Sequence, residues 1–459
     1  MSDPVRSLIS RAARAAVFSR SGSLRSRAAR AAVFSRSGSL RSRAARAAGF
    51  SRRPLGLVLG LVLVLAGCAQ DAELDTFQDR SEPARQINDL MYPVLIVAGV
   101  VLALVCGAIL WLAVKNRVPA DKDYEGEFPT QVSHNNRLEI GWTIGPAVIM
   151  TVIAVATLIT HVAVNSTEAN AIEVQVDGQT ETWEPRVVVV GQQWWWEYRY
   201  YLTRDITTED LGKLGEDADW ELPRADIVTA GQMVIPTGQE VELIITSRDV
   251  IHSHWIPALN GKKDAVPGLY TPWKLEADEP GVYFGQCTEF CGLSHSRMRM
   301  QAVAVTPGDF QDWIDAQMDE ATMPTDEDTA EYRGMEVFTN YCASCHLVTG
   351  LNDGDYNGAE TYSGSAPDLT HFAGRTTFAG GLFNLYNPDG SLNDDDLAAW
   401  IRNPNDVKEN YADDLPEGSL PRGMPDMGLS ERQISDVIAL LATLGPRPTE
   451  AQILATEVE

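Results

Sequence analysis

A short segment in the second half of the chain gathers side chains that bind soft metals. Residues 283–300 read YFGQCTEFCGLSHSRMRM, and their candidate metal ligands are Cys287, Cys291, His295 and Met298. His252 lies upstream, in the sequence DVIHSHW. Thiolates, imidazoles and a thioether together are the ligand set that copper prefers. Because a mononuclear blue-copper site uses a single cysteine, two cysteines indicate more than one copper ion.

Two other interpretations of this pattern use fewer of its residues. A disulfide between Cys287 and Cys291 would suit an oxidising compartment. It would leave both histidines and Met298 without a role. A zinc site would accept cysteine and histidine, but methionine is not a usual zinc ligand. We therefore predict a copper site in which two thiolates bridge two ions and each ion takes one histidine.

A second group of residues, nearer the C-terminus, predicts a covalently attached haem. Residues 342–346 read CASCH, the C-x-x-C-H pattern in which two thiols add to the haem vinyl groups. Cys342 and Cys345 would form the thioethers, and His346 would be the proximal iron ligand. A redox dithiol or half of a zinc site would use the same cysteines. The predicted export of this region and its helical pattern favour haem.

The iron also needs a second axial ligand. Met424, in the sequence RGMP, precedes the last predicted helix, and thioether ligation suits a high-potential electron carrier. Met427 is three residues further on, and His371 would give bis-histidine ligation instead. We favour Met424. Arg375 and Trp400 are candidates for contacts with the haem propionates.

Composition limits what kind of protein presents these groups. The net charge of −26 excludes a general nucleic-acid binder, and the 44% hydrophobic content excludes a wholly disordered chain. Six cysteines are too few for a disulfide scaffold. The charge is uneven, because residues 1–67 hold 13 arginines and a single acid, Asp3. The strongly acidic remainder should attract basic partners, and salt should weaken that attraction.

The basic N-terminal region resembles a leader that directs export. Residues 10–25 read SRAARAAVFSRSGSLR and are repeated at residues 26–41, followed by an apolar run at Leu55–Leu65 and the sequence LAGC. A basic flank before a short apolar run predicts a signal peptide over residues 1–67. The LAGC ending resembles a bacterial lipobox, which implies cleavage before Cys68 and a lipidated segment 68–89. The alternative is an ordinary first membrane helix.

Two longer apolar segments predict membrane-spanning helices. Residues 90–114 and residues 140–164 are each 25 residues long and uncharged, which is enough to cross about 30 Å of hydrocarbon. They predict a helical hairpin over residues 90–165 with both ends on one side of the membrane. A lipidated Cys68 would place everything after residue 165 outside, and basic residues in the linking loop agree.

The outer part of the chain divides into a β region and a helical region. Residues 166–306 are rich in β-branched and aromatic residues, which predicts a small antiparallel barrel or sandwich with an inserted loop at 203–230. Residues 307–330 predict a linker with one short helix near Phe310–Met318. A helical domain over residues 331–447 would follow, with a tail at 448–459. Ser430 begins its last helix in a capping-box pattern.

The copper motif resembles a known family. C-x-x-x-C-x-x-x-H-x-x-M, preceded by DVIHS and KDAVPG, is similar to the CuA domain of cytochrome c oxidase subunit II, and the likeness runs from the membrane hairpin to about Val305. It implies a cupredoxin fold and a binuclear copper centre. The Glu289 side chain would face a magnesium site shared with subunit I. The implied copper ligands are His252, Cys287, the carbonyl oxygen of Glu289, Cys291, His295 and Met298.

The same resemblance suggests roles for three further residues. The sequence QWWW at 193–196 matches an aromatic cluster over the copper, in which an exposed tryptophan, here Trp194, receives the electron. Glu139 matches a glutamate near a proton path into subunit I, although a carboxylate at a helix start is also a helix cap. His254 stands where the family usually has an aromatic residue, so we leave it out of the ligand set and expect a surface histidine.

Taken together, the patterns predict a multidomain membrane protein. It would consist of a two-helix transmembrane hairpin, an all-β cupredoxin domain and an all-α domain that resembles class I cytochrome c. The expected function is to pass electrons from a donor through haem c to CuA and on to subunit I, where dioxygen is reduced to water and protons are pumped. Expected partners are subunit I, subunit III and a donor, either a cytochrome or a quinol-oxidising complex. The expected location is a bacterial cell membrane, with both redox domains outside.

Two other functions fit the same cofactors. The chain could supply electrons to a nitric oxide reductase through CuA and haem c. It could also be a free-standing electron-transfer lipoprotein, although two spanning helices would then be superfluous beside a lipid anchor. A quinol-oxidising subunit II would lack the copper ligands found here.

Overall fold

The computed structural model describes residues 72–117, 133–167, 169–214, 222–352, 366–412, 422–449 and 452. The predicted signal peptide and Cys68 lie outside these residues, as do most of the loop between the two membrane helices and nearly all of the predicted tail.

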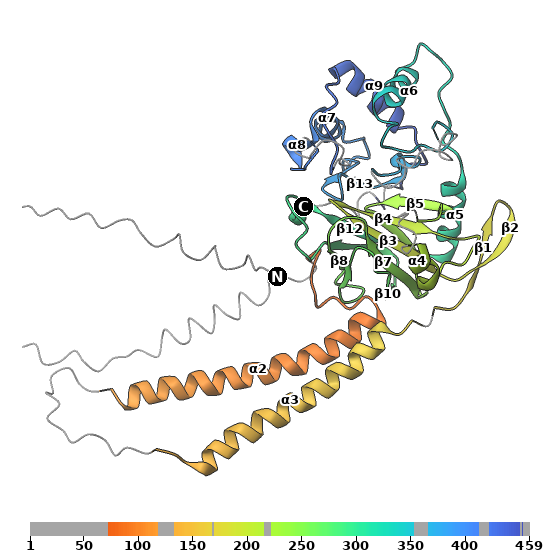
Figure 1. Ribbon diagram of the computed structural model, residues 1–459. Coiled ribbons are helices and arrows are strands. Elements are labelled where there is room, and N and C mark those ends of the chain that lie inside the picture. The colour runs from red at the N-terminus through yellow and green to blue at the C-terminus, as the bar shows by residue number, and fades with distance from the viewer. Residues whose placement is uncertain are drawn as a thin grey trace, which may run out of the picture. The chain divides into compact units, whose positions relative to one another are not determined.

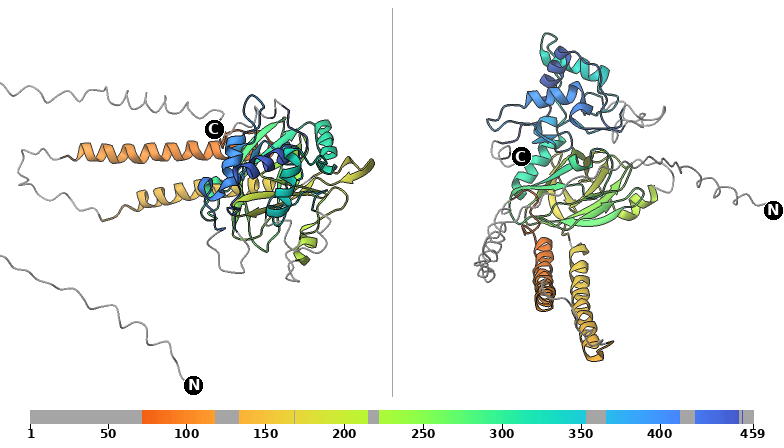
Figure 2. Two further views of the ribbon diagram at one scale, coloured as in Figure 1. Left: turned by 90° about the horizontal axis from the view of Figure 1, so that it is seen from above. Right: turned by 90° about the vertical axis from the view of Figure 1, so that its left-hand side faces the viewer.

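Two long apolar helices, α2 (Glu82–Lys115) and α3 (Asn136–Asn165), confirm the predicted pair of spans. Their most apolar stretches have mean hydropathies of 2.9 and 2.3. They lie side by side (Figures 1 and 2). The α2 helix begins at Glu82 rather than at Leu90, because the Ser81 hydroxyl accepts a hydrogen bond from the Ala84 N–H and a proline stands in the first turn.

The residues after α3 fold into two main β-sheets. One sheet has five strands in the order β10-β7-β3-β4-β5, and the other has three in the order β11-β12-β6. The prediction of a purely antiparallel domain is wrong in two places, because β3 pairs with β7 and β12 pairs with β6 in parallel. The strands are β1 Ile172–Val176, β2 Gln179–Trp183, β3 Arg186–Gln192, β4 Trp195–Tyr200, β5 Ile227–Ala230, β6 Gln232–Pro236, β7 Val241–Ser247, β8 His252–His254, β9 Lys263–Ala265, β10 Thr271–Leu275, β11 Gly281–Gln286 and β12 Arg299–Val305.

The central strand β3 explains a continuous apolar run in the sequence. Val187 and Val189 face the main core, while Val188 and Val190 face a second cluster that includes Leu211 and Leu222. A strand buried on both faces needs no polar alternation. The predicted insertion at 203–230 is therefore more than a loop, because it covers this face with α4 (Thr208–Leu214) and ends in strand β5.

The short helix predicted within the linker is α5 (Pro307–Met318). Phe310 and Ile314 are buried in the core of the β domain, where the Phe310 ring stacks on Trp183 at 5.5 Å between centroids. Since α5 belongs to the β domain, the true connection to the next helix is only the stretch from Asp319 to Thr329.

Helices are the main regular elements in the described part of residues 331–447, although loops make up more of it, and the region has a core of its own. The last helix begins at the predicted capping box, where Ser430 and Gln433 cap each other. One short strand pair interrupts the expected all-α pattern. The elements are α6 Ala330–Tyr341, β13 Thr377–Phe378, β14 Phe383–Asn384, α7 Asp394–Arg402, α8 Pro404–Val407 and α9 Glu431–Leu441.

Helices α6 and α9 approach closely at Gly334, which leads to a stability prediction. A Cβ atom at this position would lie 2.0 Å from the carbonyl oxygen of Asp436. Gly334→Ala should therefore force the helices apart and destabilise this region by about 1–3 kcal/mol. Pulse proteolysis at rising temperature should show earlier cleavage within residues 331–447. Gly308→Ala is the control, because its Cβ would meet only Thr306 Oγ1 at 4.0 Å, and equal cleavage in both variants would contradict the prediction.

Candidate metal centre and adjoining cavity

Three strand ends position the predicted copper ligands. His252 is the first residue of β8, and Cys287 directly follows β11. The antiparallel pair β11–β12 closes the base of the intervening loop, because Gln286 faces Arg299 and the Cys287 N–H donates to the Met298 carbonyl at 2.9 Å. The loop must therefore fold back over its own base, which places its ligand side chains beside His252.

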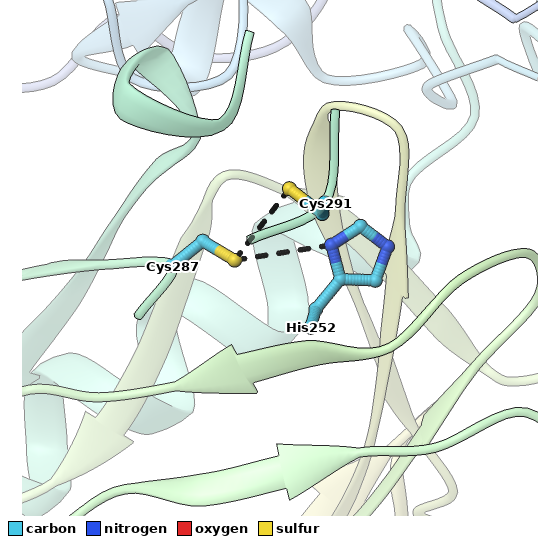
Figure 3. A group of neighbouring side chains, drawn as sticks. All are labelled: His252, Cys287 and Cys291. Atoms are coloured by element: carbon cyan, nitrogen blue, oxygen red, sulfur yellow. Dashed lines mark hydrogen bonds between the residues drawn. The ribbon is translucent and has the colours of Figure 1, made fainter. Parts of the chain in front are cut away.

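Three of the predicted ligands, His252, Cys287 and Cys291, converge as the sequence predicts (Figure 3). Cys287 Sγ lies 3.9 Å from His252 Nδ1 and 3.3 Å from the Glu289 carbonyl oxygen. Cys291 Sγ lies 3.5 Å from His295 Nδ1 and 3.9 Å from Met298 Sδ.

The two cysteine sulfurs are not joined to each other. They lie 3.8 Å apart and both are free thiols, whereas a disulfide would hold them at about 2.05 Å. Two sulfurs at this separation, each with its own imidazole and a weak third donor, fit the donor set expected of a binuclear copper centre.

The electrostatics of the thiol pair favour a bound cation. The contact with Cys291, with further hydrogen bonds from its surroundings, lowers the pKa of Cys287 to about 4 despite burial. The same contact, together with burial, raises the pKa of Cys291. One proton therefore leaves easily and the second does not. A metal cation supplies the positive charge that lets both sulfurs become thiolates.

Asp249 anchors the histidine from the side away from the thiols. Its carboxylate is 2% exposed and accepts from His252 Nε2 at 2.8 Å, which leaves Nδ1 free to face Cys287. Burial lowers the pKa of His252, but the hydrogen bonds and charges of Asp249 and Cys287 together outweigh it, and the net shift is upward. Asp249 also accepts from the Gln193 N–H at 2.7 Å and from Arg422 at 3.3 Å.

Trp194 lies against the metal-binding loop, although it is not exposed as expected. Its indole Nε1 donates to the Cys291 carbonyl at 3.1 Å. Only 3% of the residue is accessible, because the Tyr411 ring from the C-terminal region packs on it at 5.2 Å between centroids. The predicted contact with the copper loop is confirmed, and the prediction of an exposed surface is wrong.

Three more predicted positions are also located. The Glu289 side chain is exposed, so it is free to face a partner. Glu139 caps α3 by accepting from the Asn135 N–H at 2.9 Å, and a role in proton transfer stays a prediction. His254 is buried rather than on the surface, packed edge-on to Trp196 with its Nε2 at 3.3 Å from the Tyr198 hydroxyl. Burial lowers the pKa of His254 to about 3, so it stays neutral inside the core.

A cavity of about 270 Å³ adjoins this loop and contains the C-x-x-C-H residues. Cys342, Cys345 and His346 line one side, with Met424 and Met427 also at the wall. His346 Nδ1 lies 2.7 Å from the Pro367 carbonyl, which fixes the tautomer and leaves Nε2 as the free ligand atom. Burial lowers the pKa of His346 to about 4, so the ring is neutral, as an iron ligand must be.

The structure also locates the residues predicted to contact the haem propionates and the alternative axial ligand His371. Arg375 and Trp400 line the cavity, as expected for propionate contacts. His371 is not among the described residues that line it, and its Nε2 lies 2.9 Å from the Gln317 carbonyl instead. This placement disfavours bis-histidine ligation and leaves both methionines as candidates.

Sequence reasoning missed a shared wall between the two sites. Residues of the β domain also line the cavity, namely Gln193, Trp194, Trp195, Ala230 and Gly231. Lys408 lines it from the C-terminal side and is buried. The QWWW motif marks part of this wall, but no local pattern shows that it meets the C-terminal region, because these positions come together only through folding.

Comparison with known proteins agrees with this geometry. Residues 69–159 match the family described as cytochrome c oxidase subunit II, transmembrane domain, and residues 186–305 match its periplasmic domain. Cytochrome c oxidase subunit 2 of Alkalihalophilus pseudofirmus is 34% identical over 84% of this chain and 94% of its own length, and that of Bacillus sp. (strain PS3) is 29% identical over 76% and 87%.

A solved structure shows a more limited likeness. The periplasmic domain of subunit II of cytochrome oxidase from Bradyrhizobium japonicum is 27% identical, with a TM-score of 0.23, and the match covers 29% of this chain and 93% of that domain. The family matches and the length of the shared sequence show that this chain belongs to the cytochrome c oxidase subunit II family.

Proposed function

We propose that this oxidase subunit carries two redox cofactors, a covalent haem c and the binuclear copper centre CuA. When bound, they would relay single electrons from a donor to subunit I, which reduces dioxygen to water and pumps protons. The observation that carries this proposal is the shared wall: the cavity with the C-x-x-C-H residues also touches Trp194, whose indole donates to the Cys291 carbonyl.

The copper would be held by His252, Cys287, the Glu289 carbonyl, Cys291, His295 and Met298. Support comes from the distances among these groups and from their burial, since both cysteines are 3% exposed and Met298 is fully buried. A buried, largely apolar setting excludes water, so little solvent has to reorganise when the charge changes. Asp249 orients His252 in this arrangement.

The haem would be held by thioethers at Cys342 and Cys345, with His346 as the proximal ligand and Met424 as the distal ligand. The apolar wall suits a porphyrin, and it includes Phe338, Phe372 and Leu441. Arg375 would pair with a propionate. Burial lowers the pKa of Arg375 to about 10, so it still carries its charge at neutral pH.

The setting of the subunit follows from its family and its helices. It is a membrane protein with an outer copper domain, and subunit I is its partner. We further propose a bacterial cell membrane, a lipid on Cys68, contacts with subunit III, and a magnesium ion shared with subunit I through Glu289. The donor would be a soluble cytochrome or a quinol-oxidising complex.

The haem assignment has a direct chemical test. Acid-acetone extraction should leave the haem on the chain, and Met424→Ala should lower its reduction potential by on the order of 100 mV because a thioether ligand favours the reduced iron. Met427→Ala is the matched control and should leave the potential unchanged. Extractable haem would contradict the attachment, and the reverse methionine pattern would make Met427 the ligand.

A further inference from the structure

Five consecutive residues of the C-terminal region, 407–411, form a docking segment on the copper domain. The Val407 carbonyl accepts from Arg297 at 2.6 Å, and the Glu409 carbonyl accepts from the Ser294 hydroxyl at 2.6 Å. Both donors belong to the metal-binding loop. The Tyr411 ring covers Trp194. The segment therefore contacts the copper loop and the tryptophan beside it at once.

Lys408 occupies the middle of this segment and is the sole lysine in residues 275–459. It is 4% exposed, and its Nζ donates to the Trp194 carbonyl at 2.8 Å and to the Ala379 carbonyl at 2.7 Å. One acceptor belongs to the copper domain and the other to the C-terminal region. A buried amine, charged or neutral, is costly unless it is hydrogen-bonded, so these two carbonyls must be held close to it.

The backbone on the far side of the lysine is shaped for this contact. Gly380 has φ +73°, and a Cβ atom there would lie 2.6 Å from both Lys408 Nζ and the Trp194 carbonyl oxygen. Ala379 takes the left-handed conformation as well, with φ +55°, which is unusual for a residue other than glycine. The turn thus offers the Ala379 carbonyl to the lysine. The lack of a side chain at Gly380 lets the C-terminal region approach Trp194 closely.

We infer that Lys408 is a positioning residue that fixes the C-terminal region on Trp194, so that the haem cavity and the copper centre keep one geometry. This deepens the proposed function and rests on it. The region would then be a docked part of the electron path and not a carrier moving on a flexible tether. Electron transfer slows as the distance between donor and acceptor grows, so a displaced C-terminal region should deliver electrons more slowly.

Cleaving the stretch between α5 and α6 tests whether Lys408 holds the C-terminal region on the copper domain. This test does not depend on measuring turnover. A protease site would be inserted after Thr325, an exposed position, and cleaved in the assembled membrane complex. A tag at the C-terminus would then report whether the C-terminal fragment released by this cleavage stays bound after washing. The unsubstituted chain should retain the fragment. Lys408→Met should release it, with affinity lowered about 10- to 100-fold, the usual effect of losing hydrogen bonds to a charged group.

Lys262→Met is the matched control, because it removes the same charge from an exposed lysine of the copper domain and should retain the fragment. In the uncut complex, flash-induced electron transfer from haem to copper should slow about tenfold or more in Lys408→Met, with both optical spectra unchanged. Full retention with an unchanged rate in Lys408→Met would overturn the inference, as would equal release in Lys262→Met.

A second variant covers the case in which Lys408→Met does not assemble. Gly380→Ala keeps the lysine but places a Cβ atom 2.6 Å from its Nζ and from the Trp194 carbonyl oxygen, so it should also weaken retention. Full retention of the Gly380→Ala fragment would then overturn the inference. Haem staining of the denatured chain tests the proposed function separately from the inference. If the chain carries no covalent haem, the proposed function is refuted, whether or not the C-terminal fragment is retained.

Discussion

Replacing Cys287 with serine is expected to abolish the binuclear copper signals of this subunit. Cys287 Sγ lies within 4 Å of His252, Cys291 and the Glu289 carbonyl, so it links the His252 side of the site to Cys291. A serine hydroxyl is a hard donor that stays protonated near neutral pH and does not replace a bridging thiolate. The optical and EPR spectra of the purified subunit should lose the features of a mixed-valence copper pair.

Cys106→Ser provides the control, because Cys106 is exposed on α2 far from the loop in sequence. Metal analysis should find two copper ions per chain in the unsubstituted protein and in Cys106→Ser. Cys287→Ser should hold one or none. Zinc in the unsubstituted protein, or a copper pair that survives Cys287→Ser, would show that the two thiolates do not bridge a binuclear copper centre.

The copper ligands could be predicted because most of them lie on one loop. Four ligand side chains fall between Cys287 and Met298, and the strands on either side pair with each other, so the loop has few ways to fold. His252 comes from another strand, but its place in DVIHS identified it by resemblance. The proposed haem ligands are equally local, since C-x-x-C-H would supply three of them within five residues.

What could not be predicted depends on contacts between distant residues. His254 looked like a surface residue, but Trp196 and Tyr198 from β4 enclose it. Trp194 looked exposed, but Tyr411 is more than two hundred positions away in the sequence and covers it. The acidic stretch at 203–230 hid the few apolar side chains that pack on β3. Patterns along a chain report local structure and do not show which distant surfaces meet.

The covering of Trp194 also sets the order in which electrons should move. Because the indole is 3% exposed and faces the haem cavity, a soluble donor has no direct contact with it. We therefore expect external electrons to reach the haem first and the copper second. Rapid mixing with a reduced soluble cytochrome should show the haem band changing before the copper band. The second phase should be independent of donor concentration, because it occurs within one chain.

Removing the cover should open a direct route from a soluble donor to the copper. Truncation after Thr329 keeps α5, whose Phe310 and Ile314 belong to the core of the β domain, so the copper site should stay intact. The exposed Trp194 surface should then accept electrons directly from a basic soluble cytochrome, at a rate that rises with donor concentration and falls steeply with salt. In the full-length chain, Trp194→Leu should slow the step from haem to copper, whereas Trp111→Leu, exposed on α2, should leave its rate unchanged. Copper reduction ahead of the haem in the full-length chain, or an unchanged second phase in Trp194→Leu, would mean that electrons reach the copper by another surface.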